Sequence, residues 1–511
     1  MEQICSLRLI SLPDSHHRTV HTTPVMRTKT SVFSPARFVF GLFVLVLSAT
    51  AFGAGAKYHY SVRLAGDLSS LTVKACFSLP LPRRLVSYDD DAFQYLRAAV
   101  LHSGPSEKHL LAGKLTLALP DIKPGDCVSY AVDIRDGEET HHGFSQRQSR
   151  RQQVLLDIHR WLWFPDPFDA NTDSIDISFR LPKGMTVSAP WQLIERAEGM
   201  VTYRYTQRPP DWDGRIAIGR FETLSRTVGQ AQVDIAILNG RSAVDTDVIR
   251  QWVNKNLDAL MLAYGEFPVP RLQVLVVPVG KDREPVPWGE VTRGGGDAIH
   301  VYIDQTRPLA DFLDDWVLIH ELSHLLLPRL AYEDHWLSEG LASYYQNLLS
   351  ARASLMSAHQ AWEKLDAGFQ RGIHGTPRNR TLAQVSESMS HNHLYMRVYW
   401  SGASISLLAD YALRRQSHNS QSLDSALAAL QRCCLPTRRL WSAWEVMQKL
   451  DTITQTDTFT RLYQQHLPST QFPDLSELYR DLGLVASGTK LTFDNHAPAA
   501  DIRQAIMSPA K

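Results

Sequence analysis

An apolar stretch at residues 316–327 constrains the fold of this 511-residue chain more than any other feature. It contains the motif H-E-x-x-H, whose fixed positions are His320, Glu321 and His324. Residues four apart lie on the same face of an α-helix, so both imidazoles can bind one zinc ion while Glu321 stands beside it as a base. Apart from the two histidines, only Glu321 is ionisable in this stretch. The sequence therefore predicts a buried helix that carries two zinc ligands.

A catalytic zinc site needs a third protein ligand, because zinc takes three and keeps the fourth position for water. Glu339 is the candidate. It lies within residues 334–345, where apolar residues recur at helical spacing and predict a second helix packed on the first. Fourteen residues separate it from His324, which is enough to turn at Pro328 and return antiparallel. The alternative is a solvated acidic residue in the first turn of that helix.

The motif, followed by Trp336-Leu-Ser-Glu-Gly-Leu-Ala-Ser-Tyr-Tyr345, resembles the gluzincin metallopeptidases, in particular the aminopeptidase N and glycyl aminopeptidase types. Val398-Tyr-Trp-Ser-Gly-Ala403 is similar to a Tyr-x-x-Gly-Ala segment that supplies a tyrosine to the transition state in those families. The resemblance implies a zinc peptidase with a thermolysin-like zincin catalytic domain, one zinc ion per chain, and Tyr399 as the catalytic tyrosine. Tyr395 is the nearest rival, and a packed core tyrosine is the alternative.

The expected substrate-binding segment departs from the aminopeptidase N pattern. That family carries Gly-Ala-Met-Glu-Asn on a strand edge, with a glutamate that holds the free amine of the substrate. This chain has Trp288-Gly-Glu-Val-Thr-Arg-Gly-Gly-Gly296 instead. We expect Glu290, together with Gly294, Gly295 and Gly296, to bind substrate, because a glycine-rich edge lets a peptide backbone approach closely. An endopeptidase stays open as the alternative to an aminopeptidase.

The patterns predict an α+β multidomain protein. Alternating strand patterns over residues 57–225 indicate a β-sandwich domain. Residues 226–350 form the expected catalytic domain, in which residues 271–278 are almost entirely apolar, as in a strand covered on both faces. A second strand, residues 298–303, is expected at the edge of the cleft, with His300 as a surface residue.

Residues 351–511 are expected to form a helical region that completes the wall of the active-site cleft. Apolar residues at helical spacing predict five helices there, followed by a short strand and a helical turn. The predicted helices span residues 358–371, 402–415, 422–432, 441–450 and 459–467; the strand spans 490–493 and the turn 501–506.

The first 56 residues have the pattern of a secretory signal. Arg27, Lys29 and Arg37 precede an apolar run at residues 38–47, and small residues follow up to Ala56. We expect cleavage after Ala56, which gives an exported, periplasmic protein with no membrane span. An uncleaved anchor is the alternative, although the apolar run is short for a span.

Removal of the signal leaves four cysteines in an exported chain, where disulfides are permitted. Cys76 and Cys127 both fall in the strand-rich region, but four cysteines allow three pairings and the sequence does not choose among them. The adjacent Cys433 and Cys434 fit a disulfide and a pair of packed thiols equally well.

The balance of 53 basic and 53 acidic residues lacks the charge excess of a nucleic-acid-binding protein, so no nucleic-acid partner is expected. The family resemblance implies a peptide or protein substrate as the partner. Two hypotheses compete with a peptidase. One is an inactive zincin-fold protein of the periplasm that binds peptides without cutting them. The other is a structural zinc site, which usually has four ligands and uses cysteines. No cysteine lies near His320 or His324 in the sequence.

Overall fold

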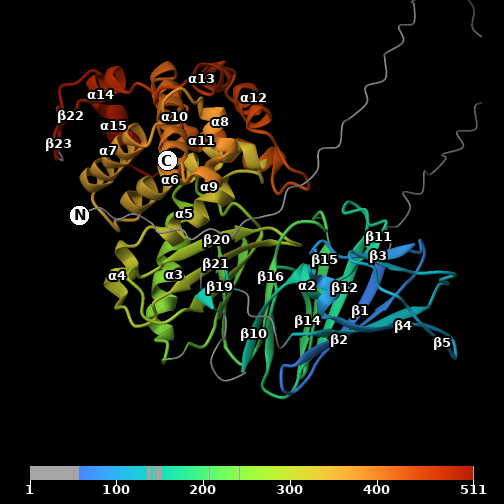
Figure 1. Ribbon diagram of the computed structural model, residues 1–511. Helices are drawn as coiled ribbons and strands as arrows, with labels where there is room; N and C mark the ends of the chain where they lie inside the picture. The colour runs from blue at the N-terminus through green and yellow to red at the C-terminus, as the bar shows by residue number, and fades with distance from the viewer. Residues whose placement is uncertain are drawn as a thin grey trace, which may run out of the picture.

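A computed structural model describes residues 57–509 except 135–139, 142–143, 146–151, 207, 241 and 489. The described chain is a multidomain α+β protein, as predicted. A strand-rich part and a helical part lie on opposite sides of a five-stranded sheet (Figure 1). The signal predicted over residues 1–56 lies outside the described residues. Among the described helices, none combines the length and apolar character needed to cross a membrane.

An eight-stranded sheet, in the order β14-β15-β12-β1-β2-β7-β4-β5, dominates the N-terminal domain, residues 57–221. β1 shows why these segments become strands: Tyr58, Tyr60, Val62 and Leu64 alternate with more exposed residues and bury one face of the strand. The strands are β1 (Lys57–Leu64), β2 (Ser70–Cys76), β4 (Leu96–Ser103), β5 (Ser106–His109), β7 (Cys127–Asp133), β12 (Ser174–Arg180), β14 (Gln192–Ala197) and β15 (Met200–Thr206).

Smaller elements complete this domain. Two three-stranded sheets share its apolar core with the large sheet, and one of them, β10-β16-β13, faces the rest of the molecule. The elements are β3 (Arg84–Val86), β6 (Thr116–Ala118), β8 (Thr140–His141), β9 (Phe144–Ser145), β10 (Gln153–Asp157), β11 (Phe164–Asp166), β13 (Thr186–Ser188), β16 (Arg215–Gly219), α1 (Ala92–Tyr95) and α2 (Ile158–Trp161).

The four described cysteines form two disulfides. Cys76 and Cys127 stand opposite each other at the end of the antiparallel pair β2 and β7, and their sulfurs are bonded. Cys433 and Cys434 are bonded to each other as neighbours in the chain. Strand pairing explains the first bond, because it brings together residues that are 51 positions apart.

The five-stranded sheet, called the central sheet below, has the order β17-β18-β19-β21-β20. Its middle strand is apolar because both faces are buried, as predicted. Val274 and Val276 pack in the core shared with the helices, whereas Leu275 and Val277 pack with Leu155 of the N-terminal domain. The strands are β17 (Glu222–Val228), β18 (Ala231–Ile237), β19 (Arg271–Pro278), β20 (Trp288–Thr292) and β21 (Asp297–Ile303).

Two predictions about this sheet are wrong. The strand at residues 297–303 is β21, which lies between β19 and β20, so β20 forms the edge. His300 is fully buried rather than on the surface, and its Nδ1 lies 3.4 Å from Oε1 of Glu290. Both errors have the same cause: β20 is short and contains Gly289, so its sequence lacks the apolar alternation of a strand. The boundary predicted after residue 225 also falls inside β17.

Helices surround the central sheet on the side away from the N-terminal domain, and their apolar faces form one continuous core with it from residue 228 to residue 507. The elements are α3 (Thr246–Met261), α4 (Leu309–Asp314), α5 (Val317–Ser323), the 3₁₀ helices η1 (His324–Leu326) and η2 (Tyr332–Asp334), α6 (His335–Arg352), α7 (Ala358–His374), α8 (Leu382–Glu387), α9 (Met389–Asn392), α10 (Tyr395–Gln416), α11 (Leu423–Cys434), α12 (Ala443–Thr454), α13 (Thr458–His466), α14 (Ser476–Leu482), β22 (Leu484–Ser487), β23 (Lys490–Phe493) and α15 (Ala500–Ile506).

The helix predicted over residues 402–415 begins earlier, at Tyr395, so Tyr399 lies inside α10 rather than before it. The sequence hides this start. Leu394 occupies the N-cap position and provides no side-chain hydrogen bond, although Ser, Thr, Asp and Asn are the residues that usually mark a helix start. His393, the residue before Leu394, adopts a left-handed conformation and ends α9.

Two glycines let α6 and α10 pack in direct backbone contact. A Cβ atom on Gly340 would clash with the backbone of Gly402, and a Cβ atom on Gly402 would clash with the carbonyl oxygen of Trp336. Gly340 follows Glu339 in the chain, and Gly402 lies three residues after Tyr399. This crossing therefore brings the third predicted ligand and the predicted catalytic tyrosine to the same place.

We predict that Gly402→Ala lowers the free energy of unfolding by about 1–3 kcal/mol, the usual cost of overpacking a close contact. Denaturant unfolding of both proteins measures the difference. Gly66→Ala is the matched control, because a Cβ atom there meets nothing within 4 Å. Equal stability of the parent and Gly402→Ala would contradict the role of this contact.

Candidate metal centre

The motif helix, defined as α5 with η1, is shorter than the predicted helix at residues 316–327. Its α-helical part ends at Ser323, and a 3₁₀ turn continues from His324 to Leu326. Every residue of α5 is buried. At its start, the N–H of Val317 donates to a carboxyl oxygen of Asp315 at 2.7 Å. Burial raises the pKa of Asp315 to about 7, so the hydrogen bond does not offset the loss of water around this carboxyl group.

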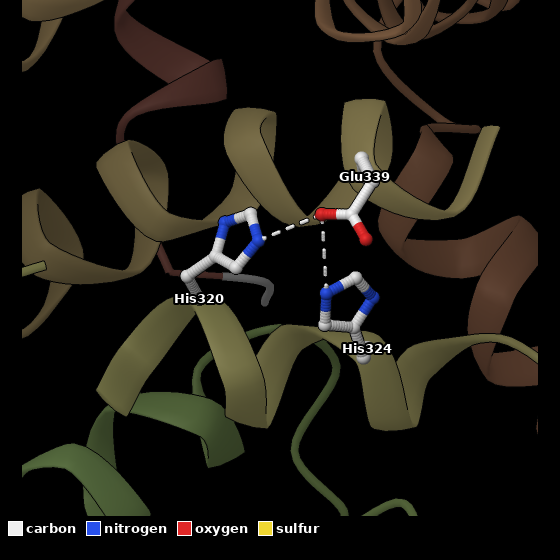
Figure 2. Close-up of side chains that lie close together, drawn as sticks. All are labelled: His320, His324 and Glu339. Atoms are coloured by element: carbon white, nitrogen blue, oxygen red, sulfur yellow. Dashed lines mark hydrogen bonds and ion pairs between the residues drawn. The ribbon is translucent and has the colours of Figure 1, made fainter. Parts of the chain in front are cut away.

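The motif helix and α6 bring the three predicted zinc ligands together (Figure 2). Oε2 of Glu339 lies 3.1 Å from Nε2 of His320 and 3.5 Å from Nε2 of His324. One donor atom from each residue lies within 4.8 Å of the others. Two imidazole nitrogens and one carboxylate are the ligand set of catalytic zinc sites that leave one position for water. The residues present therefore fit a zinc ion.

The other ring nitrogens have partners on α6. Nδ1 of His320 lies 2.7 Å from Oε1 of Gln346, and Nδ1 of His324 lies 3.0 Å from Oγ of Ser338. An Nδ1–H that donates to these oxygens leaves each Nε2 unprotonated and directed at the metal position. Neither residue was predicted from the sequence. Their positions relative to Glu339 could have identified them as partners of the histidines, since Ser338 is its neighbour and Gln346 lies two helical turns away.

Charge and burial oppose each other at these residues. Burial disfavours ionisation of Glu339, but the charges and hydrogen bonds of His324 and His320 outweigh it and hold the pKa of Glu339 well below its usual range. Burial disfavours the charged form of His320, yet the hydrogen bond and charge of Glu339 raise its pKa overall. Positive charge at this position therefore stabilises the ionised carboxylate of Glu339 despite its burial.

Glu321 lies beside this cluster and is 9% exposed. Burial raises its pKa, while the charges of His324 and His320 oppose the shift. Gly289 on the edge strand β20 packs directly on it: a Cβ atom at residue 289 would come within 2.7 Å of Cγ of Glu321 and 2.6 Å of Val317. The glycine thus lets the strand lie against the motif helix, next to the predicted base.

Tyr399 projects from α10 to the same place. Its ring stacks on the ring of His320 at a centroid distance of 5.9 Å and an interplanar angle of 10°. Burial raises the pKa of Tyr399 well above its usual value, and the charges of Glu339 and Glu321 add to this shift. The phenol therefore keeps its proton and can donate a hydrogen bond. The ring of Tyr395 contacts the ring of Tyr399 at a centroid distance of 6.3 Å.

Glu290, the predicted amine-binding residue, already has protein partners. Its carboxylate forms an ion pair with Arg215 of the N-terminal domain and lies near the ring of His300. It is close enough to Glu321 for its charge to raise the pKa of that residue. A substrate amine would therefore compete with Arg215 for this carboxylate, and the role of Glu290 stays a prediction.

The three predicted substrate-binding glycines lie at the junction with the N-terminal domain. Gly294 packs on the backbone of Trp212 and Asp213, Gly295 on the rings of Trp191 and Tyr205, and Gly296 on the carbonyl oxygen of Pro190. Gly295 also has a positive φ of 75°, which favours glycine. Close packing between domains accounts for their lack of side chains, so substrate binding by them stays a prediction.

Part of this site lies in a segment that resembles a known peptidase family. The model of a peptidase family, the M61 glycyl aminopeptidases, matches residues 329–422, a segment that contains Glu339 and Tyr399 and begins after the H-E-x-x-H motif. Compared by sequence with curated proteins, the chain has no significant match.

Two solved structures show the shared fold. One is an aminopeptidase N family protein from Idiomarina loihiensis, with a TM-score of 0.63 and 13% identity over 85% of this chain and 82% of that one. The other is an M1 zinc metallopeptidase from Deinococcus radiodurans, with a TM-score of 0.50 and 17% identity over 82% and 95%. The predicted resemblance to gluzincin metallopeptidases of these two types is confirmed.

We predict that purified protein contains close to one zinc ion per chain, bound by His320, His324 and Glu339. Alanine at any one of them should lower the zinc content after dialysis, because each removes one of three ligands. Metal analysis measures this. His359→Ala, a change to a half-exposed histidine on α7, is the control. Full zinc retention in all three ligand variants would refute the site.

Proposed function

We propose that this protein is an exported, zinc-dependent peptidase of the gluzincin type with a thermolysin-like catalytic domain. The observation that carries the proposal is the convergence of His320, His324 and Glu339 beside Glu321 and Tyr399. A metal site, a base and a hydrogen-bond donor are the three parts that hydrolysis of an amide requires. The match to a peptidase family over residues 329–422 supports the same conclusion.

The residues divide the reaction among them. When bound, zinc lowers the pKa of a water molecule to about 7 and polarises the scissile carbonyl. Glu321 accepts a proton from the attacking water, and its raised pKa suits a group that must hold this proton briefly. Tyr399 donates a hydrogen bond to the oxyanion that develops on the carbonyl oxygen. Glu321 then delivers its proton to the leaving amine.

The first test concerns Glu321. We predict that Glu321→Gln keeps its zinc and its fold but loses about 10²- to 10⁴-fold in kcat, because it cannot accept the proton. Turnover of a peptide library, with products identified by mass, measures activity. Glu363→Gln on α7 is a matched control away from the site. If the Glu321→Gln variant cuts as fast as its parent, the proposed base is wrong.

Tyr399→Phe removes only a hydroxyl group. It should lower kcat by about 10²- to 10³-fold with little change in KM, because the lost hydrogen bond forms in the transition state. Zinc content and melting temperature should stay near those of the parent. Tyr395→Phe serves as the control, and a loss of activity there instead would transfer the role to Tyr395.

The cleavage mode depends on Glu290. We propose aminopeptidase activity, in which the free amine of the substrate displaces part of the pairing between Glu290 and Arg215. N-acetylated peptides should then be poor substrates, and Glu290→Gln should raise KM for free peptides. Kinetics on matched free and acetylated peptides decide this point. Equal cleavage of the two would indicate an endopeptidase.

Two further parts of the proposal concern location and competing functions. Export rests on the signal pattern at residues 1–56, and the bond between Cys76 and Cys127 suits an oxidising compartment. An inactive peptide-binding protein is not favoured, because each group that the chemistry needs is present in the chain and a peptidase family matches residues 329–422. A nucleic-acid partner is not proposed, since the chain carries no excess positive charge.

A further inference from the structure

The C-terminal end of the motif helix is held by an arginine from outside the helix. The last carbonyl groups of a helix have no partner within it. Nη2 of Arg293 donates to the carbonyl oxygens of His324 at 2.9 Å and of Leu327 at 3.1 Å. The carbonyl of His324 also accepts from the N–H of Leu327, at 3.3 Å. The shorter hydrogen bond to the backbone of this predicted zinc ligand thus comes from a side chain.

Arg293 is itself buried, with 7% of its surface exposed. Burial lowers its pKa to about 10, so it remains charged at neutral pH. A buried guanidinium is unfavourable unless its charge and its N–H groups are satisfied. A positive charge is favourable at the C-terminal end of a helix, where carbonyl oxygens gather. The charge of Arg293 is therefore matched to the helix end that it contacts.

The buried carboxylate of Asp297 lies beside Arg293 and balances its charge. Oδ1 of Asp297 lies 3.8 Å from Nη1 of Arg293, and Oδ2 lies 2.6 Å from Nη2 of Arg208, which belongs to the N-terminal domain. Nη1 of Arg208 donates in turn to the carbonyl oxygen of Thr437, between α11 and α12. One buried cluster therefore joins the N-terminal domain, the central sheet and the helical region to the end of the motif helix.

We propose that Arg293 is a positioning residue for the zinc ligand His324. It fixes the backbone of the last turn, while Ser338 fixes the imidazole ring through Nδ1, and together they set the direction of Nε2. This inference rests on the zinc site of the proposed function. Loss of an outer partner at a metal site typically lowers metal affinity by about 10- to 100-fold.

The test compares zinc affinity in the full chain with and without this contact. Arg293→Met removes the donors but keeps an apolar side chain of similar length. Competition with a chromophoric chelator should show a zinc Kd about 10- to 100-fold higher than that of the parent. The visible spectrum of the cobalt-substituted protein should also change, because a displaced His324 alters the coordination geometry. Arg293→Lys keeps one donor group, so its zinc Kd should lie between those of the parent and Arg293→Met.

Arg352→Met is the matched control. Arg352 is also buried and donates to two backbone carbonyls, those of Leu262 and Ile506, at the far end of α6. Its loss should lower stability without moving the zinc Kd or the cobalt spectrum. Such a result would separate general packing from positioning of the ligand.

The proposal is overturned if Arg293→Met keeps a zinc Kd within about twofold of the parent and an unchanged cobalt spectrum. If Arg293→Met does not fold, Arg293→Lys decides by the same two measurements. A parent protein that binds no zinc would overturn the proposed function and this inference with it. A parent that binds zinc alongside an unaffected Arg293→Met would overturn this inference alone.

Discussion

The site depends on one requirement: buried imidazoles and carboxylates must each find a partner, because an unpaired polar group inside a protein is costly. α6 meets most of this requirement. It supplies Glu339 to both histidines, Gln346 to His320 and Ser338 to His324. The motif helix and α6 must therefore keep a fixed separation and rotation, and the rest of the domain is arranged to hold that pair.

Glycine contacts transmit this geometry to neighbouring elements. The Gly340–Gly402 contact sets the distance between α6 and α10. Because α10 lies this close, the ring of Tyr399 can stack on the ring of His320. On the other side, Gly289 lets β20 lie against Glu321. Close packing of α6 and α10 thus explains why residue 402 in the Tyr-x-x-Gly-Ala segment is glycine, without any chemical role for it.

The features that depend only on neighbouring residues in the chain could be predicted from the sequence. The four-residue spacing of His320 and His324 follows from the helical repeat, and β19 could be predicted from its unbroken apolar run. Glu339 could be predicted from the need for a third ligand and from its place on a helix that can return antiparallel, although a solvated glutamate was the alternative. β20 and the start of α10 were missed, since Gly289 and Leu394 give no strand or capping signal. Arg293 was not identified, because only tertiary packing brings residue 293 to the carbonyl of residue 324.

The burial of β19 on both faces has a consequence for the order in which the chain can fold. Leu275 and Val277 in β19 are covered by Leu155 and Ala217, residues that precede them in the chain. Domains generally fold as units. The surface that receives this face of β19 belongs to the N-terminal domain, which has a separate core of its own. That domain can therefore fold first and offer a finished apolar surface on which β19 packs.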